Sequence, residues 1–513
     1  MYGKVTVNDL PMEVLAYVFQ HIQQDRLGSF TFPYPTPDAP REVKNTCKNS
    51  PFRELVTIQH VCRYWRQVLQ TFPLLWTTIF LPAPHYVTHS GEVVTTCGHN
   101  SDQDESHGPR KAGWCSWPRA DVSIQLPTLG HIGHCLSLSG SHPLSVYSVD
   151  HVHGLNLVER QAHRLRHLQI GYTLKSVPAV FNIIWNALDG FRAPVPLLES
   201  LDIGLCIPED ADAWSDHDGI DMPIRGLSLP VLFSQRMPRL KRLRLAGVAP
   251  WTRNHFRRLT HLCLTGWRLM ETSPTNIHEL LSLLRQSPGL EEVYLSHLDP
   301  WIYESLDEPP VVNDKGDAIH LRKLRRLSVS DCYAAQILVL FAYLHVPVGS
   351  AVVLSKIQGT GVNIDSVGIC TRYPTHFGNM SELHRVELET TYYESKGLAF
   401  GPSGALQITT MRAGDWQSLS RPLHFTKLPL SSLEKLCLHN MAVQEVFRTL
   451  TPESDESDDN DNKAVPCELL QTLWMSDPEE EDLDYYDALL RCAKTRHARK
   501  FPLKSVRMDG LDG

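Results

Sequence analysis

A short phrase of apolar residues recurs along the chain from residue 144 almost to its last residue. The phrase reads apolar-x-x-apolar-x-apolar, and the alternation of its last three positions is the period of a short strand with one buried face. Successive copies begin 19 to 59 residues apart. The pattern predicts eleven strands, in phrases that begin at Leu144, Leu165, Leu198, Leu240, Leu259, Leu290, Leu324, Leu383, Leu433, Leu470 and Leu503.

Helical patterns lie between several of these phrases. Residues 276–286 place Ile277, Leu280, Leu281 and Leu284 on one face of a helix. A repeated order of strand, turn and helix is typical of a leucine-rich solenoid. We therefore expect residues 120–513 to form an irregular leucine-rich-repeat-like α/β solenoid. The alternative is a generic α/β domain with leucine-rich strands.

Residues 335–354 carry no formal charge and are long enough to span a membrane. Gln336, His345, Pro347 and Gly349 interrupt the apolar run, however, and the run follows a predicted strand. The pattern favours a buried helix over about residues 334–345, followed by a turn and a strand. We therefore predict no membrane domain.

Two apolar helical patterns precede the array, near residues 11–22 and 54–71. In the first, Leu15 and Phe19 are four residues apart, as are Val14, Val18 and Ile22, so we expect all five to share one flank of a helix. In the second, helical spacing continues to a Phe-Pro stop through Leu55, Ile58, Val61, Cys62, Trp65 and Leu69.

These two patterns carry a family resemblance. The sequence Leu-Pro-x-Glu-Val-Leu-x-x-Val-Phe at residues 10–19 is followed by Val-Cys-x-x-Trp at 61–65 and by Leu-Trp at 75–76. This order resembles the F-box, a three-helix module that docks on the Skp-family adaptor of SCF ubiquitin ligases. The resemblance covers residues 7–22 and 51–81 and implies an adaptor-binding domain at residues 1–82. A proline-rich insert at residues 26–50, which the compact module lacks, reads as an extended loop. The alternative is a plain helical hairpin.

The resemblance implies that the chain is the non-catalytic substrate receptor of an SCF-type cullin ubiquitin ligase, which tethers a protein substrate for ubiquitination and proteasomal degradation. Its mechanism would be proximity, because the substrate lysine is held near the charged ubiquitin-conjugating enzyme. The alternatives are a non-degradative scaffold, and an α/β ligand-binding or enzymatic protein with a helical cap. By resemblance, the residues that serve the adaptor interface or its packing are Leu10, Pro11, Leu15, Phe19, Val61, Cys62 and Trp65.

Composition adds the cellular setting. An apolar content of 42% and a charged content of 21% are typical of a soluble globular chain. The net charge of −8 argues against a nucleic-acid partner. Twelve cysteines without a repeating framework indicate reduced thiols in the cytoplasm or nucleus. The first residues contain no apolar signal region, so we do not expect secretion.

Candidate chemistry is sparse. The sequence contains no Gly-x-Ser-x-Gly, Gly-Lys-Ser/Thr or His-Glu-x-x-His motif. We expect residues 83–119 to form an irregular linker and residues 453–461 to form an acidic loop, in which Ser454 and Ser457 suit acidophilic kinases. We expect no cofactor and no metal, because no Cys-x-x-Cys pair accompanies the zinc-ligand types Cys97, His99, His107, Cys115, His131, His134 and Cys135.

In a solenoid, the strand positions that alternate with the core positions face outward and carry function. Many of the predicted outward positions are basic or histidine, although the chain is acidic overall. Such a face suits an acidic or phosphorylated segment of the substrate, because guanidinium groups bind carboxylate and phosphate oxygens. The alternative is a solvated sheet face without a ligand. The candidate substrate-binding residues are Arg242, Arg244, His261, Arg326, Arg385 and Lys435.

Overall fold

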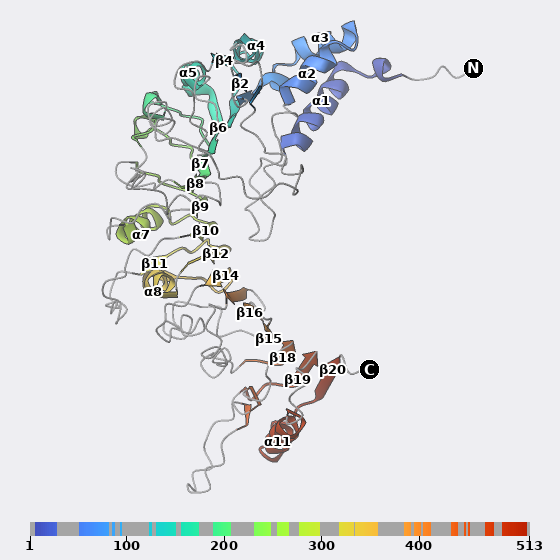
Figure 1. The fold of residues 1–513 in the computed structure, drawn as a ribbon, viewed down its shortest axis with the longest axis vertical. Coiled ribbons are helices and arrows are strands. Elements are labelled where there is room, and N and C mark those ends of the chain that lie inside the picture. The colour runs from blue at the N-terminus through green and yellow to red at the C-terminus, as the bar shows by residue number, and fades with distance from the viewer. Residues whose placement is uncertain are drawn as a thin grey trace, which may run out of the picture. The chain divides into compact units, whose positions relative to one another are not determined.

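The structure is a computed structural model of the whole chain (Figure 1). It divides into two compact units, residues 1–222 with 228–254, and residues 223–227 with 255–513. The residues that it describes are 6–27, 51–81, 85–87, 93–94, 123–125, 130–149, 155–173, 188–206, 230–247, 254–265, 276–297, 318–332, 334–357, 384–390, 394–401, 404–411, 432–439, 446–447, 450–451, 467–476 and 485–509.

The first unit begins with a helical layer and continues as a parallel sheet. The helical layer consists of η1 (Val7–Asp9), α1 (Met12–Leu27), α2 (Pro51–Gln59), α3 (Arg63–Thr71) and η3 (Pro73–Trp76). The sheet has the order β1-β5-β6-β7-β8, and each neighbouring pair is parallel. Its strands are β1 (Thr78–Leu81), β5 (Leu144–Val149), β6 (Leu165–Thr173), β7 (Ser200–Cys206) and β8 (Arg242–Ala246).

Short elements connect these strands. A small antiparallel sheet has the order β3-β2-β4, from β2 (His85–Val87), β3 (Val93–Val94) and β4 (Ser123–Gln125). Two of its strands lie inside residues 83–119, for which the sequence predicts only irregular structure. The helical connections are α4 (Gly130–Leu138), α5 (Leu155–Glu159), η4 (Ala162–Arg164) and η6 (Phe233–Gln235).

The second unit carries a longer sheet with the order β9-β10-β12-β14-β17-β16-β15-β18-β19-β20. Its strands are β9 (His261–Thr265), β10 (Glu292–Ser296), β12 (Arg326–Ser330), β14 (Ala351–Ile357), β15 (Arg385–Thr390), β16 (Glu394–Phe400), β17 (Ala405–Met411), β18 (Lys435–His439), β19 (Thr472–Ser476) and β20 (Ser505–Asp509). The other elements are α7 (Asn276–Gln286), β11 (Ile319–His320), α8 (Ala334–Tyr343), β13 (Leu344–His345) and α11 (Tyr485–Ala498). Helices α7 and α8 lie on the same side of the neighbouring strands (Figure 1).

One strand of the second unit runs against the others. β16 is antiparallel to both β15 and β17, whereas all other neighbours in this sheet are parallel. Only three residues separate β15 from β16, and four separate β16 from β17. Connections this short allow a hairpin and exclude the crossover that a parallel pair needs.

The apolar phrases predict the strands correctly. All eleven predicted strands are present, as β5 to β10, β12, β15 and β18 to β20. The fold is a mixed α/β architecture with mostly parallel strands and few helices among the described residues. β14, β16 and β17 show no such phrase, and the sequence predicts only the first of them.

The apolar positions of each phrase form the core. Leu290, Val293 and Leu295 are buried in β10 and the turn before it, and α7 covers the sheet with Leu280 and Leu284. A fully buried leucine contributes about 2 kcal/mol, so this repeated burial is the main stabilising term of the sheet.

The uncharged segment at residues 335–354 is a buried helix, a turn and a strand, as predicted: α8, β13 and β14. Among the helices that the structure describes, none is long and apolar enough to cross a membrane. The acidic run at 453–461 and nearly all of the insert at 26–50 lie outside the described residues, although the insert's first two residues belong to α1.

Candidate functional site

The N-terminal helical layer has a core of its own. Phe19 on α1 contacts the ring of Trp65 on α3 edge to face, with ring centroids 5.3 Å apart. The indole N–H of Trp76 donates to the carbonyl of Leu69 at 2.7 Å, which ties η3 to the end of α3. The almost fully buried side chains of this core are Leu15, Phe19, Leu55, Val68, Leu69, Leu75 and Trp76.

A second set of apolar side chains on α1 is exposed. Successive residues of a helix are 100° apart, so Val14 and Val18 lie on a different face from Leu15 and Phe19. Ile22 lies only about 20° from Leu15 in angle, seven residues further along α1, and it is exposed. The exposed fractions are 43% for Val14, 61% for Tyr17, 42% for Val18 and 38% for Ile22. We call these four residues the α1 stripe. The prediction that both sets share one flank is therefore wrong for Val14 and Val18, because Leu15 and Phe19 pack inside while these two valines face outward.

The residues that the F-box resemblance assigns to the adaptor interface fall into two groups. Leu15 and Phe19 are buried and can shape an interface only through packing. Pro11 is exposed, Leu10 is half-buried, and Val61 is 56% exposed. The sequence reasoning omitted the α1 stripe from this set, although its spacing was visible, because periodicity alone does not say which of two apolar faces is covered.

Cys62 interrupts the second helical pattern. α2 ends at Gln59, and α3 begins at Arg63. Between them Cys62 has extended backbone angles (φ −158°, ψ 169°), and its Sγ accepts a hydrogen bond from the backbone N–H of Trp65 at 3.5 Å. The helical spacing of residues 54–71 therefore continues across a break, and Cys62 is a half-buried N-cap between the two helices.

In the second unit, the predicted outward residues occupy matching positions on neighbouring strands. His261, Glu292 and Arg326 are register partners on β9, β10 and β12. His261 Nε2 lies 3.9 Å from Glu292 Oε1, and the Arg326 guanidinium lies 5.3 Å from the centre of the Tyr294 ring. Two predicted binding residues, His261 and Arg326, thus contact groups of the protein's own sheet.

A second group lies on β15 and β18 to β20. Arg385 and Lys435 are register partners, and Arg385 also forms an ion pair with Glu387. Lys435 Nζ and the Arg507 guanidinium both lie over the Trp474 ring, at 5.3 and 5.0 Å from its centroid. Each such cation–π contact contributes about 0.5–1 kcal/mol at an exposed site.

The remaining two candidates lie in the first unit. Arg242 and Arg244 are both on β8, and Arg244 lies 3.5 Å from the carboxylate of Asp202 on β7. Burial raises the pKa of the Asp202 carboxyl to about 6, and the nearby Arg244 opposes this rise. The six candidates are therefore divided between β8 in the first unit and β9, β12, β15 and β18 in the second.

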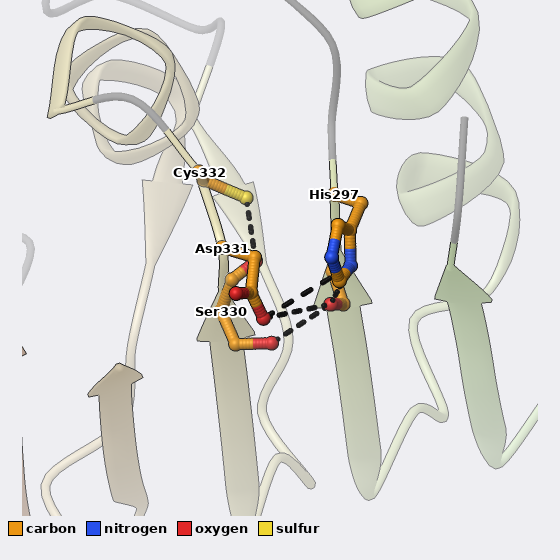
Figure 2. A network of polar contacts seen from close by, with 5 residues as sticks. His297, Ser330, Asp331 and Cys332 are labelled. Carbon is orange, nitrogen blue, oxygen red and sulfur yellow. Dashed lines mark hydrogen bonds and ion pairs between the residues drawn. The ribbon is translucent and has the colours of Figure 1, made fainter. Parts of the chain in front are cut away.

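A polar network joins the carboxyl ends of β10 and β12 (Figure 2). The Ser330 hydroxyl donates to Ser296 Oγ at 2.9 Å, and Ser296 Oγ lies 2.8 Å from His297 Nδ1. Asp331 Oδ2 is 3.5 Å from Ser296 Oγ and 4.0 Å from His297 Nδ1, and Cys332 Sγ donates to the carbonyl of Ser330. The sequence analysis did not identify this network, because its members come from two strands 34 residues apart.

The network has the residue types of a serine hydrolase but a different geometry. In a catalytic triad the hydroxyl and the carboxylate bind opposite nitrogens of the imidazole. Here Ser296 and Asp331 both approach Nδ1 of His297. In a triad the carboxylate orients the ring while the opposite nitrogen takes the proton of the hydroxyl, and two groups on the same nitrogen cannot divide these roles. The network connects two strands by hydrogen bonds.

The zinc-ligand types near residue 130, His131, His134 and Cys135, all lie on α4. His134 on α4 packs edge to face on Trp76, with ring centroids 5.6 Å apart. Burial raises the pKa of the Cys135 thiol to about 12, which disfavours the thiolate that binds metal. No group of three potential metal ligands occurs within the described part of the chain, and Cys97, His99, His107 and Cys115 lie outside it.

No protein-family model matches the chain, and no curated protein matches it.

Proposed function

We propose that the chain is the substrate receptor of an SCF-type cullin ubiquitin ligase, with an F-box-like helical layer that binds a Skp-family adaptor. The observation that carries this proposal is the α1 stripe, Val14, Tyr17, Val18 and Ile22. Other side chains form the buried core of the helical layer, so the four exposed apolar side chains of α1 are not needed for the layer to fold. Exposed apolar stripes of this kind are typical of protein interfaces.

The sheet supports the receptor part of the proposal. Cationic and aromatic side chains occupy register positions on two sets of strands, β9, β10 and β12, and β15, β18, β19 and β20, as they would on a leucine-rich-repeat-like surface. We propose that an acidic segment of the protein substrate binds there. The chain would act by proximity, holding a substrate lysine near the ubiquitin-conjugating enzyme and contributing no reacting group.

The test is complex formation between the full chain and a purified Skp-family adaptor, followed by titration calorimetry. Val14→Asp and Val18→Asp place a charge on the α1 stripe and should weaken adaptor binding by at least tenfold, because an unpaired carboxylate would be desolvated. Val348→Asp in the second unit, where Val348 is also exposed, is the matched control and should leave binding unchanged.

The possible results separate the alternatives. Adaptor binding that Val14→Asp abolishes, with ubiquitination once a cullin and a conjugating enzyme are added, supports the receptor function. Adaptor binding without cullin recruitment would identify a non-degradative scaffold. If the folded wild-type chain does not bind the adaptor, the proposal fails, and the helices would serve as a cap on an α/β ligand-binding or enzymatic protein.

A further inference from the structure

The sheet of the second unit ends at β20. Among the strands that the structure describes, β20 pairs with β19 and is the last in the order. The N–H of Ser505 donates to the carbonyl of Gln471 at 3.1 Å, so the backbone of Ser505 faces β19. Backbone groups of successive strand residues point alternately to the two sides, so the N–H and C=O of Val506 and Met508 point away from β19.

The apolar columns of the sheet are open at the same edge. Val506 is the register partner of Leu473, which is fully buried, whereas Val506 is 42% exposed. Leu490 on α11 is exposed as well. A repeat array needs a polar cap to protect its last apolar layer, and an open edge strand readily pairs with another strand. The outward backbone groups of β20 and the exposed side chain of Val506 indicate that a further strand fits beside β20.

The charge of the residues in and before β20 indicates what kind of strand would pair with this edge. Residues 488–508, which run from α11 into β20, contain no aspartate or glutamate in a chain whose net charge is −8, and the first acidic residue after them is Asp509 at the end of β20. A second copy would bring two such cationic edges together, so self-pairing through β20 is disfavoured, and an acidic segment is attracted. The cationic residues outside the core of this segment are Arg491, Lys494, Arg499, Lys500, Lys504 and Arg507.

We propose that the open edge of β20 binds an extended acidic segment of a partner protein by strand addition. The partner's main chain pairs with the outward N–H and C=O groups of Val506 and Met508. Its alternate apolar side chains cover Val506, and its acidic side chains lie beside Lys504 and Arg507. This site is in the second unit and involves no residue of the helical layer, so it stands apart from the adaptor proposal.

The experiment measures fluorescence anisotropy of the full chain with three labelled nine-residue peptides. The first alternates glutamate and valine, the second replaces glutamate by lysine, and the third is the first with N-methyl groups on alternate residues. We expect the acidic peptide to bind and the lysine peptide to bind at least tenfold more weakly. N-methylation should abolish binding, because it removes the donors of the peptide backbone while leaving its charge unchanged.

Two variants of the protein test the same edge. Val506→Pro removes an outward donor without removing a hydrogen bond to β19, and Lys504→Glu/Arg507→Glu reverses the charge without changing the backbone. Each of these two variants should weaken binding of the acidic peptide at least tenfold. Arg322→Glu, at an exposed turn before β12, changes the net charge elsewhere and should have no effect. Unchanged hydrogen exchange in β19 confirms that the variants fold.

Three results would overturn the proposal. Equal binding of the plain and N-methylated peptides would mean attraction by charge alone. Binding of a single-stranded DNA oligomer in place of the acidic peptide would assign the basic edge to nucleic acid. A concentration-dependent dimer that Val506→Pro dissociates would assign the edge to a second copy of the chain.

Discussion

The raised pKa of the buried Asp202 carboxyl can be tested through the pH dependence of stability. Asp202 lies on β7 opposite Arg244 on β8, and it is 8% exposed. Its pKa is raised from 3.8 to about 6 because burial outweighs the attraction of Arg244. The ionised carboxylate is therefore destabilising in the folded state, although it has a cationic partner.

The pKa shift sets the magnitude and the pH window. A carboxyl whose pKa is raised on folding contributes stability below its unfolded pKa and loses that contribution as the pH rises through its folded pKa. The rise of the Asp202 pKa from 3.8 to about 6 corresponds to about 3 kcal/mol of folding free energy, which the wild type loses between these two pH values. Asp202→Asn cannot ionise. It should therefore exceed the wild type in free energy of unfolding by about 3 kcal/mol at pH 7.5, but by only about 1 kcal/mol at pH 4.5.

The assay is hydrogen exchange of β7 and β8 across a urea series, which reports on the first unit of the full chain. With a urea slope of about 2–3 kcal/mol/M, the unfolding midpoint of Asp202→Asn should rise by about 1 M at pH 7.5. The control is Asp189→Asn, which removes an exposed carboxylate that pairs with Arg192. This control should shift the midpoint little at either pH, because surface ion pairs contribute about 0–1 kcal/mol.

Two results would contradict a destabilising ionised Asp202. If Asp202→Asn is less stable than the wild type at pH 7.5, the attraction to Arg244 outweighs the desolvation of the carboxylate. An advantage of the same size at both pH values would assign the effect to packing of the amide and not to ionisation.

Three further predictions concern buried polar groups. Ser330→Ala removes the donor to Ser296 and should cost about 1 kcal/mol, measured as earlier urea unfolding of the second unit; an unchanged midpoint would contradict it. Arg496→Leu removes the buried donor to the carbonyl of Cys467 and should cost about 3 kcal/mol by the same assay; a loss under about 1 kcal/mol would count against it. His167 has a pKa below 6.5, chiefly because of burial, so its neutral form is favoured on folding. The wild type should lose stability as the pH falls below about 6.5, and His167→Gln should lose less; equal pH profiles would refute this.

Eleven strands and much of the core follow from the amino-acid sequence alone, whereas no apolar phrase marks β1, β16 or β17. Each apolar phrase contains the two-residue period of a strand, and this local spacing predicts core side chains such as Val293 and Leu295, although Tyr294 between them is buried as well. The buried helix at 334–343 is predictable for a similar reason, because its apolar run is too interrupted for a membrane span.

Which surfaces are covered depends on tertiary packing. Val14 and Leu15 have similar local chemistry, but α2 and α3 pack against one face of α1 and leave the other exposed. The pairing of Asp202 with Arg244, and of Ser296 with Ser330, depends on strand register between residues more than thirty positions apart. The periodicity of the sequence cannot predict such contacts, because they form only when neighbouring strands pair. The open edge of β20 likewise follows from the order of strands in the sheet.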